Sequence, residues 1–363
     1  MNEKYMKRAL ELAEKGKGKV NPNPMVGAVI VKDGKIIGEG YHKVFGGAHA
    51  EINAINSTSI DIEGSTLYVT LEPCSHFGKT PPCALEIVKQ KFKKVVIGML
   101  DPNPLVSGNG VKILRDNGIE VEIGLLKSQC KSLNECFIKY IVEKKPFVIL
   151  KVAMSLDGKI ADKMGHSKWI TGDKAIEMVH KTRSEVCGIM VGIGTVLTDD
   201  PMLTSRIEGG RNPHRIIIDS NLKIPIGAKV LNIKDEAMTI VATTKNAPKE
   251  KINILKKMGV KTLIIKNNDR RVSLKHLMIE LGNLNIDSIL LEGGAELNYS
   301  AIENGIVDKL QVYISPKIIG GLNSKTPMSG VGKNLIDAIK IKNMKVKTIG
   351  EDIFIEGYVK RGD

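Results

Sequence analysis

The fold of the first half of this chain is decided by two stretches, AHAEINAIN at residues 48–56 and TLEPCSHFGKTPPC at residues 70–83. They contain one imidazole, His49, and two thiols, Cys74 and Cys83, with each cysteine directly after a proline. One nitrogen and two sulfur ligands leave the fourth tetrahedral position of a zinc ion open for water, which is the catalytic arrangement. Zinc lowers the pKa of such a water from about 15.7 to about 7, so the two stretches predict a zinc-dependent hydrolytic site.

Glu51 stands two residues after His49 and is the candidate general acid and base. It would carry a proton from the water to a ring nitrogen and then to a departing amine, so it must not bind the metal itself. Residues two apart in a helix interior face away from each other, so the pair works only if His49 lies at a helix entrance. We expect helices to begin at His49 and just after Pro82, where the helix N-terminus would stabilise the Cys83 thiolate.

Strands and helices alternate around these two stretches, and this alternation predicts a layered α/β sheet covered by helices. The residues Asp33-Gly34 are a strong signal for a tight hairpin turn. Lys144-Lys145-Pro146 ends the last helix, so we place a domain boundary there, between residues 1–145 and 146–363. The expected strands are residues 25–31, 35–41, 66–71, 94–99 and 120–123, and the expected helices are residues 3–15, 48–56, 84–91, a segment after Gly108, and 127–143.

The second half alternates in the same way. Glycines between a strand and a helix let backbone amides approach a ligand phosphate at the positive end of the helix, and Gly293-Gly294 has this placement. Gly192-Ile193-Gly194 does not complete a dinucleotide fingerprint, because Leu197 stands where the third glycine belongs; a plain tight turn fits it equally well. The expected strands lie near residues 147–152, 186–191, 215–218, 239–242, 262–265, 288–291, 309–314, 344–349 and 353–359, and the expected helices are 249–258, 273–282 and 296–304.

Composition narrows the class of protein. With 363 residues the chain is long enough for two ordinary cores, and it has no run of 18 apolar residues and no secretory signal. Five cysteines are too few and too uneven for a disulfide framework, so we expect a reducing cytoplasm. A net charge of +14 attracts anions, and because the lysines are scattered it favours small phosphorylated substrates over nucleic acid.

The motif His49-Ala50-Glu51 with Pro73-Cys74 resembles the cytidine deaminase superfamily, although eight residues separate Cys74 from Cys83 where that superfamily usually has two. The segment 70–83, with NPNPMVGAV at residues 21–29 and DPNP at residues 101–104, resembles one branch closely, the bifunctional riboflavin biosynthesis deaminase/reductase family. The similarity continues through the second half. It implies a cytidine-deaminase-like three-layer α/β/α domain followed by a dihydrofolate-reductase-like α/β domain.

For the first domain the resemblance implies a zinc-dependent aminohydrolase. Its substrate would be 2,5-diamino-6-ribosylamino-4(3H)-pyrimidinone 5′-phosphate, which loses its 2-amino group. His49, Cys74 and Cys83 would bind zinc and Glu51 would be catalytic. Asn23, His76 and Lys79 would bind substrate; an amide suits a pyrimidine edge and a lysine suits a phosphate, although each alone is also an ordinary loop residue.

For the second domain the resemblance implies NADPH-dependent reduction of the ribosyl side chain to ribityl. The two arginines expected at the substrate offer forks for a sugar phosphate, but the residues alone indicate no proton donor. Trp169 could stack beside the cofactor or fill the core, and Asp199 could hold hydroxyls or belong to an ordinary turn. The expected cofactor residues are Ala153, Trp169, Thr195, Asp199, Ser220, Gly294, Ala295, Glu296, Leu297, Asn298, Tyr299 and Ser300, and the expected substrate residues are Ser167, Arg183, Leu203, Arg206 and Glu292.

Two other functions share part of this pattern. A deaminase acting on a transfer RNA base would share the zinc site, but the scarcity of aromatic residues and the lack of a basic stripe argue against it. A structural zinc module would need a fourth ligand, for which His42 and His76 are the candidates. We therefore expect small phosphorylated pyrimidine substrates, no nucleic-acid or membrane partner, and a homo-oligomer.

Overall fold

The computed structural model describes residues 2–75, 77, 81–104, 106–167, 169–268 and 270–360. The chain divides into two compact units, Met1–Lys144 and Lys145–Asp363. Each unit has its own sheet and its own hydrophobic core. Within the described ranges, no helix is both long and apolar enough to cross a bilayer.

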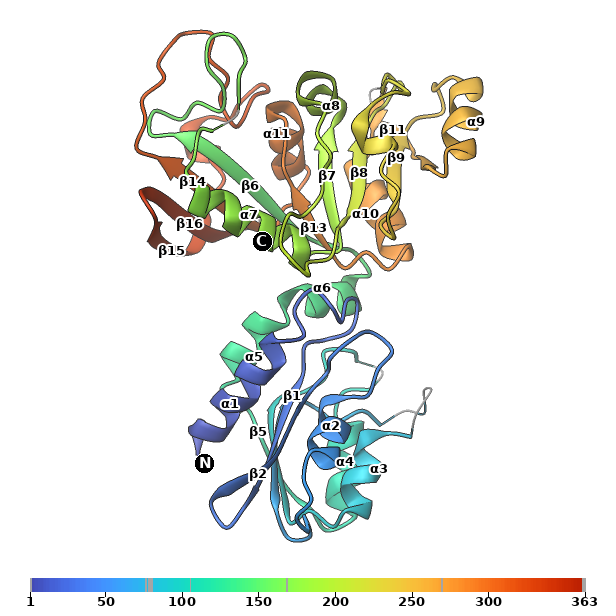
Figure 1. Ribbon diagram of the computed structural model, residues 1–363, viewed down its shortest axis with the longest axis vertical. Coiled ribbons are helices and arrows are strands. Elements are labelled where there is room, and N and C mark those ends of the chain that lie inside the picture. Colours follow the sequence, from blue (N-terminus) through green and yellow to red (C-terminus); the bar gives the residue numbers. More distant parts are fainter. Residues whose placement is uncertain are drawn as a thin grey trace. The chain divides into compact units, whose positions relative to one another are not determined.

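The first unit is a sheet between two layers of helices (Figure 1). Its strand order is β2-β1-β3-β4-β5, antiparallel between β2, β1 and β3 and parallel from β3 to β5. Helices α1 and α5 cover one face, and α2, α3 and α4 cover the other, which confirms the three-layer prediction. The elements are α1 Glu3–Glu14, β1 Gly27–Lys32, β2 Lys35–Tyr41, α2 Ala50–Asn56, β3 Thr66–Leu71, α3 Cys83–Lys89, β4 Lys94–Met99, α4 Asn109–Asp116, β5 Glu120–Ile123, α5 Lys127–Leu133 and α6 Glu135–Glu143.

Strand β1 is apolar on both faces because helices cover both faces of the sheet. Val29 and Val31 pack in the cluster with α1, whereas Ala28 and Ile30 pack in the cluster with α2, as the period-two alternation of a strand requires. The turn into β2 has positive φ at Asp33 (51°) and Gly34 (75°), the conformation that the expected tight hairpin needs.

The single helix expected over residues 127–143 is wrong. It is interrupted at Asn134, which ends α5 and precedes α6. The Asn134 side chain accepts a hydrogen bond from the Met25 N–H (2.8 Å) and donates one to the Met25 carbonyl (2.9 Å). A tertiary contact with a residue 109 positions away therefore decides this break, and the periodicity of the helix did not reveal it.

The second unit is a larger sheet with the strand order β10-β9-β8-β7-β13-β6-β14-β16-β15. The strands from β10 to β14 are parallel, and β16 and β15 are antiparallel additions at one edge. The elements are β6 Phe147–Ser155, α7 Asp173–Glu185, β7 Gly188–Gly192, α8 Ile193–Asp199, β8 His214–Ile218, β9 Thr239–Thr243, α9 Lys249–Lys257, β10 Lys261–Ile264, β11 Asn267–Asn268, β12 Arg271–Val272, α10 Leu274–Asn283, β13 Ser288–Leu291, α11 Ala295–Glu303, β14 Lys309–Ser315, β15 Ile341–Ile349 and β16 Asp352–Val359, with short 3-10 turns at Lys229–Leu231 and Leu335–Asp337.

Helices cover both faces of this sheet. Side chains of α10 and α11 pack in one apolar cluster and those of α8 and α9 in another. Helix α7 was not predicted, although Ala175, Met178 and Val179 have helical spacing; Ala175 packs with Tyr313 of β14 and Phe354 of β16. Helix α8 was not predicted either. It begins directly after Gly192, so Gly192 and Gly194 lie where strand β7 joins a helix.

Candidate active sites

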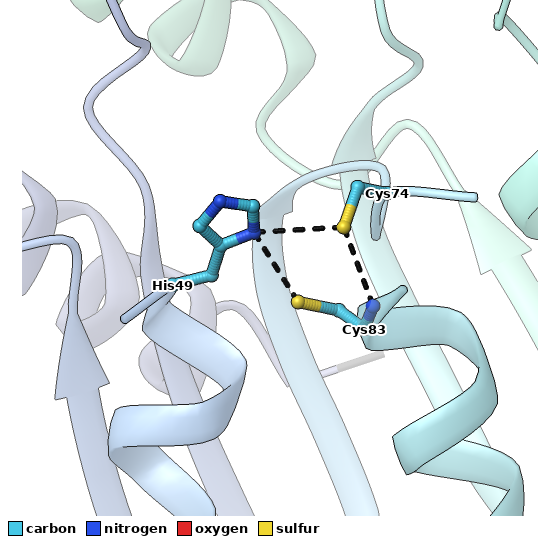
Figure 2. Close-up of side chains that lie close together, drawn as sticks. All are labelled: His49, Cys74 and Cys83. Carbon is cyan, nitrogen blue, oxygen red and sulfur yellow. Dashed lines mark hydrogen bonds between the residues drawn. The ribbon is translucent and has the colours of Figure 1, made fainter. Parts of the chain in front are cut away.

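Three side chains that are distant in sequence meet in the first unit. The His49 Nδ1 atom lies 3.5 Å from the Cys74 Sγ and 3.3 Å from the Cys83 Sγ, and the Cys83 backbone N–H donates to the Cys74 Sγ at 3.3 Å (Figure 2). The ligand atoms all lie within 4.8 Å of one another. Nitrogen and sulfur ligands of tetrahedral zinc stand about 3.5 Å apart, from bond lengths near 2.0 and 2.3 Å. The donor set and its spacing therefore fit zinc.

Secondary structure places each of these side chains. His49 is the N-cap of α2 with an extended backbone (φ −72°, ψ 166°). It therefore lies at the helix entrance, as it must if His49 and Glu51, two residues apart, are to act at the same site. Cys83 is the first residue of α3, after Pro82 as N-cap. Helix α2 can lie against β2 because Gly40 has no side chain; a Cβ there would collide with the backbone of Ala50 and Ala54.

The two cysteine thiols of the site differ in pKa because of their neighbours. The pKa of the Cys74 thiol is lowered to about 4, first by a hydrogen bond from Cys83 and then by His49. The pKa of Cys83 is raised by the neighbouring Cys74 and by burial, because two adjacent sulfurs do not both ionise without a cation. The pair therefore favours a metal cation, which compensates two thiolates at once.

Glu51 lies beside the ligands but is not one of them. It is in the first turn of α2, 3% exposed, and its carboxyl group hydrogen-bonds the Cys83 side chain. Burial, and then the charge of Cys74, raise the pKa of Glu51 to about 7. A carboxyl group with a pKa near neutral can both accept and donate a proton.

Of the two candidate fourth ligands, only His42 lies within the described part of the chain, and it is not part of the ligand group. His42 is buried, and both ring nitrogens have hydrogen-bond partners: Nδ1 lies 3.1 Å from the Ala48 carbonyl oxygen, and Nε2 lies 3.2 Å from the Asn23 Nδ2. The only metal-binding group found among the described residues contains His49, Cys74 and Cys83. His76 and Lys79, predicted to bind substrate, lie outside the described residues.

Glu72, for which no role was predicted, organises the loop beside the second ligand. Its buried carboxylate accepts the backbone N–H groups of Asp101 (3.1 Å), Gly108 (3.0 Å) and Val111 (3.2 Å). These contacts tie the DPNP segment and the start of α4 to the end of β3. The glutamate immediately precedes Pro73-Cys74, but its three partners are 29 to 39 residues away, so no local pattern indicates them.

In the second unit, the turns that follow the parallel strands meet at the carboxyl ends of these strands. This carboxyl-end edge, which differs from the outermost strands β10 and β15, is the usual place for a ligand in such sheets. The Gly192 N–H donates to the Gly293 carbonyl at 2.8 Å. A Cβ at Gly294 would lie 3.6 Å from the Thr195 Oγ1, so these two predicted cofactor residues are neighbours. Ser220 follows β8, and its hydroxyl accepts the Val272 N–H at 3.1 Å.

Next to this edge is a nearly buried ion cluster. Arg183 donates to both oxygens of Glu292 (2.7 and 2.8 Å) and to the Thr204 carbonyl (3.0 Å), and the Lys151 Nζ lies 3.3 Å from the same carboxylate. Burial alone would raise the pKa of Glu292, but Arg183 and Lys151 outweigh it and lower that pKa below its ordinary value. The fork of Arg183 is thus occupied by Glu292, whereas Arg206 is exposed. Lys151 was not predicted.

Trp169 does not fill the core. It is 71% exposed and has a positive φ of 64°, so the core interpretation is wrong. Its carbonyl accepts a hydrogen bond from the Lys317 Nζ at 2.7 Å, which joins the loop after β6 to the loop after β14. Nearby, the Ser167 hydroxyl lies 3.5 Å from an oxygen of Asp199, at the end of α8.

Most of the other predicted residues of this unit lie in helix α11. Gly294 is the N-cap of α11, so Gly294 to Leu297 form the start of this helix, which lies next to Gly192 at the start of α8. The next three side chains bond to protein: Asn298 donates to the Pro327 carbonyl (2.9 Å), Tyr299 to the Gly332 carbonyl (2.9 Å), and Ser300 accepts from Asn304 (3.4 Å). Ala153 lies on β6 opposite Tyr313, and Leu203 is buried in the cluster with α8 and α9.

Comparison with known proteins gives a match for each unit. Residues 1–99 match the cytidine and deoxycytidylate deaminase zinc-binding region, and residues 146–355 match the RibD C-terminal domain. The chain is 48% identical to the riboflavin biosynthesis protein RibD of Actinobacillus pleuropneumoniae over 97% of this chain and 94% of that protein.

Two solved structures are similar over nearly their whole length. RibD from Acinetobacter baumannii has a TM-score of 0.90 at 37% identity, covering 99% of both chains. A diaminohydroxyphosphoribosylaminopyrimidine deaminase/5-amino-6-(5-phosphoribosylamino)uracil reductase from Thermotoga maritima has a TM-score of 0.86 at 42% identity, covering 99% of this chain and 98% of that one. With this similarity across both units, the chain belongs to the RibD family of bifunctional deaminase/reductases of riboflavin biosynthesis.

Proposed function

We propose that residues 1–145 hydrolytically deaminate 2,5-diamino-6-ribosylamino-4(3H)-pyrimidinone 5′-phosphate and that residues 146–363 then reduce its ribosyl group to ribityl with NADPH. The observation that carries the first half is the meeting of His49, Cys74 and Cys83 beside a buried Glu51. The names of the similar solved enzyme from Thermotoga maritima describe the same two reactions. The cytoplasmic location and the absence of a nucleic-acid partner stay predictions.

In the deaminase unit, His49, Cys74 and Cys83 would hold zinc. When bound, zinc makes a water molecule nucleophilic near neutral pH. The Glu51 carboxylate would take one proton from that water and pass it to the ring nitrogen next to the attacked carbon. It would then move the second proton, from the added hydroxyl, to the amine that leaves as ammonia. Its burial in the first turn of α2, beside the ligands, keeps bulk water from competing for these protons.

In the reductase unit, the edge formed by the turns after β7, β8 and β13 would bind NADPH, which supplies hydride to C1′ of the sugar. The amide groups at the start of α11 suit the cofactor phosphates. Arg206 is exposed and would meet the substrate phosphate, whereas Arg183 and Lys151 hold Glu292 ionised at the same edge. A fixed carboxylate there can orient hydroxyl and N–H groups of the substrate.

The two activities are expected to fail separately. Cys74→Ser should remove zinc and ammonia release, because two ligands bind the metal far more weakly than three, and it should leave NADPH oxidation intact when the deaminated intermediate is supplied. Metal analysis, ammonia release and absorbance at 340 nm measure the three quantities. Cys136→Ser, in α6 and outside the ligand group, is the matched control. A folded Cys74→Ser protein that cannot reduce the supplied intermediate would contradict the assignment of reduction to residues 146–363.

We also propose that the protein is a homo-oligomer that associates through β15. This strand forms one edge of the second sheet, and its Met344 and Val346 are 56% and 63% exposed. A long edge strand with exposed apolar side chains is a template for pairing with another chain. Association of two copies along it would bury both the apolar side chains and the unpaired backbone groups.

Light scattering should therefore give a mass of about twice 39.6 kDa for the parent protein. The double variant Met344→Asp/Val346→Asp should shift the protein towards a monomer, because paired strands would bring its carboxylates together in an apolar contact. Ile264→Asp, on the opposite edge strand β10 and 59% exposed, should not. A monomeric parent, or a double variant with unchanged mass, would contradict this interface.

A further inference from the structure

A chain of hydrogen bonds runs from helix α2 to the predicted substrate residue Asn23. The Asn53 Nδ2 donates to the carbonyl oxygens of Tyr41 (2.8 Å) and Ala48 (3.1 Å). The Ala48 carbonyl also lies 3.1 Å from the His42 Nδ1, and the His42 Nε2 lies 3.2 Å from the Asn23 Nδ2. Five residues, Asn23 and four within residues 41–53, thus form one continuous network.

The chemistry of this network leaves one consistent arrangement of hydrogens. A carbonyl oxygen only accepts, so the His42 Nδ1 must carry the proton that it donates to Ala48. The atom that faces the other ring nitrogen is the Asn23 Nδ2, and because an amide NH₂ group only donates, the His42 Nε2 is the acceptor of this hydrogen bond. The partner of that acceptor must be the NH₂ group of Asn23.

This hydrogen bond to His42 fixes the orientation of the Asn23 amide. With its NH₂ group bound to His42, the Oδ1 atom is the end left to meet a ligand, and it has no protein partner within the described part of the chain. Asn23 is only partly buried. The imidazole rings of His42 and His49 are 5.6 Å apart and meet edge to face, so the network lies directly beside the predicted metal ligand.

We propose that His42 is a positioning residue that fixes the Asn23 amide with its oxygen towards the substrate, and so makes the deaminase select heterocycles that offer an N–H group there. The proposal rests on the assignment of deamination to this unit and deepens it. A ring that presents a bare nitrogen at the same place would leave two lone pairs facing each other. Without His42 the amide could rotate, and the discrimination would be lost.

A double-mutant cycle tests whether His42 acts through Asn23. His42→Phe keeps a planar ring but removes both nitrogens, and it should raise the KM for the diamino substrate about 10- to 100-fold with a smaller change in kcat. His42→Gln keeps a donor and an acceptor and should recover most of the loss. In the Asn23→Ala background, His42→Phe should add less than about a twofold effect, because the amide that it positions is gone.

Zinc content and NADPH oxidation with the deaminated intermediate are the controls, since His42 also contacts the residue before His49. Independent, multiplying effects of His42→Phe and Asn23→Ala would overturn the positioning role while leaving deamination in place. An Asn23→Ala variant with parental KM would overturn it too. A parent protein that releases no ammonia would instead contradict the proposed function.

A second measurement does not depend on the variants folding. Nitrogen NMR of the parent protein with labelled histidine should show His42 as the neutral tautomer with the proton on Nδ1 and a hydrogen-bonded, unprotonated Nε2. A proton on Nε2 would reverse the Asn23 amide and overturn the proposal.

Discussion

Glu51→Gln is expected to keep its zinc and to lose ammonia release by about 10²–10⁴-fold, the range for removal of a positioned acid and base. Glutamine preserves the shape of the side chain and its burial, but it cannot take a proton from water or return one to the departing amine. Because Glu51 is not among the metal-binding residues, zinc content should stay at the parental value. Coupled ammonia and metal assays measure both quantities.

The matched control is Glu86→Gln. Glu86 lies in the first turn of α3, the helix that begins with the ligand Cys83, and its carboxylate binds Gln90 and Lys89 at the surface. The same chemical change should there leave deamination within about twofold of the parent, as expected for a surface site. Near-normal deamination by a zinc-loaded Glu51→Gln protein would refute the role of Glu51.

Glu292→Gln is expected to have the largest effect on stability, a loss of about 3–5 kcal/mol in the unfolding free energy of the second unit. The side chains of Arg183, Lys151 and Glu292 are 16%, 15% and 8% exposed, so removal of the carboxylate charge leaves two nearly buried cations without the anion that compensates them. The rate of NADPH oxidation should fall as well, because Arg183, Lys151 and Glu292 lie at the edge of the sheet where we propose that the cofactor binds. Denaturant titration and 340 nm absorbance measure the two effects.

The pH dependence has a definite sign. The folded-state pKa of Glu292 is lowered from 4.5, so its stabilising effect is fully present above that pH and is lost as the pH falls towards the lowered value. The parent should therefore lose stability below about pH 4.5 more steeply than Glu292→Gln. Glu296→Gln is the control: its side chain is 77% exposed in a surface pair with Arg271, so a change within about 0.5 kcal/mol is expected. Equal stability of Glu292→Gln and the parent would contradict this account.

Residue types and their spacing were enough to predict the alternation of strands and helices and the group His49, Cys74 and Cys83 that the structure brings together. Metal ligands are readable because their chemistry belongs to the residues themselves: imidazole and thiolate bind zinc wherever a fold lets them meet. Helix entry at His49 was also readable, since it follows from the two-residue offset to Glu51. The assignment of reductase and substrate residues relied on family resemblance and stays a prediction.

Other features depended on partners that no local pattern indicates. The break of the long helix at Asn134 needs Met25, and the ionisation of Glu292 needs Arg183, 109 residues away. The backbone of Trp169 is held by Lys317, which follows a different strand. Sequence alone thus determined which groups can do chemistry and in what order they occur along the chain. The tertiary structure decided which charges are buried together, which hydrogen bonds orient an amide such as Asn23, and which surfaces stay open, because burial and pairing are properties of contacts between distant segments.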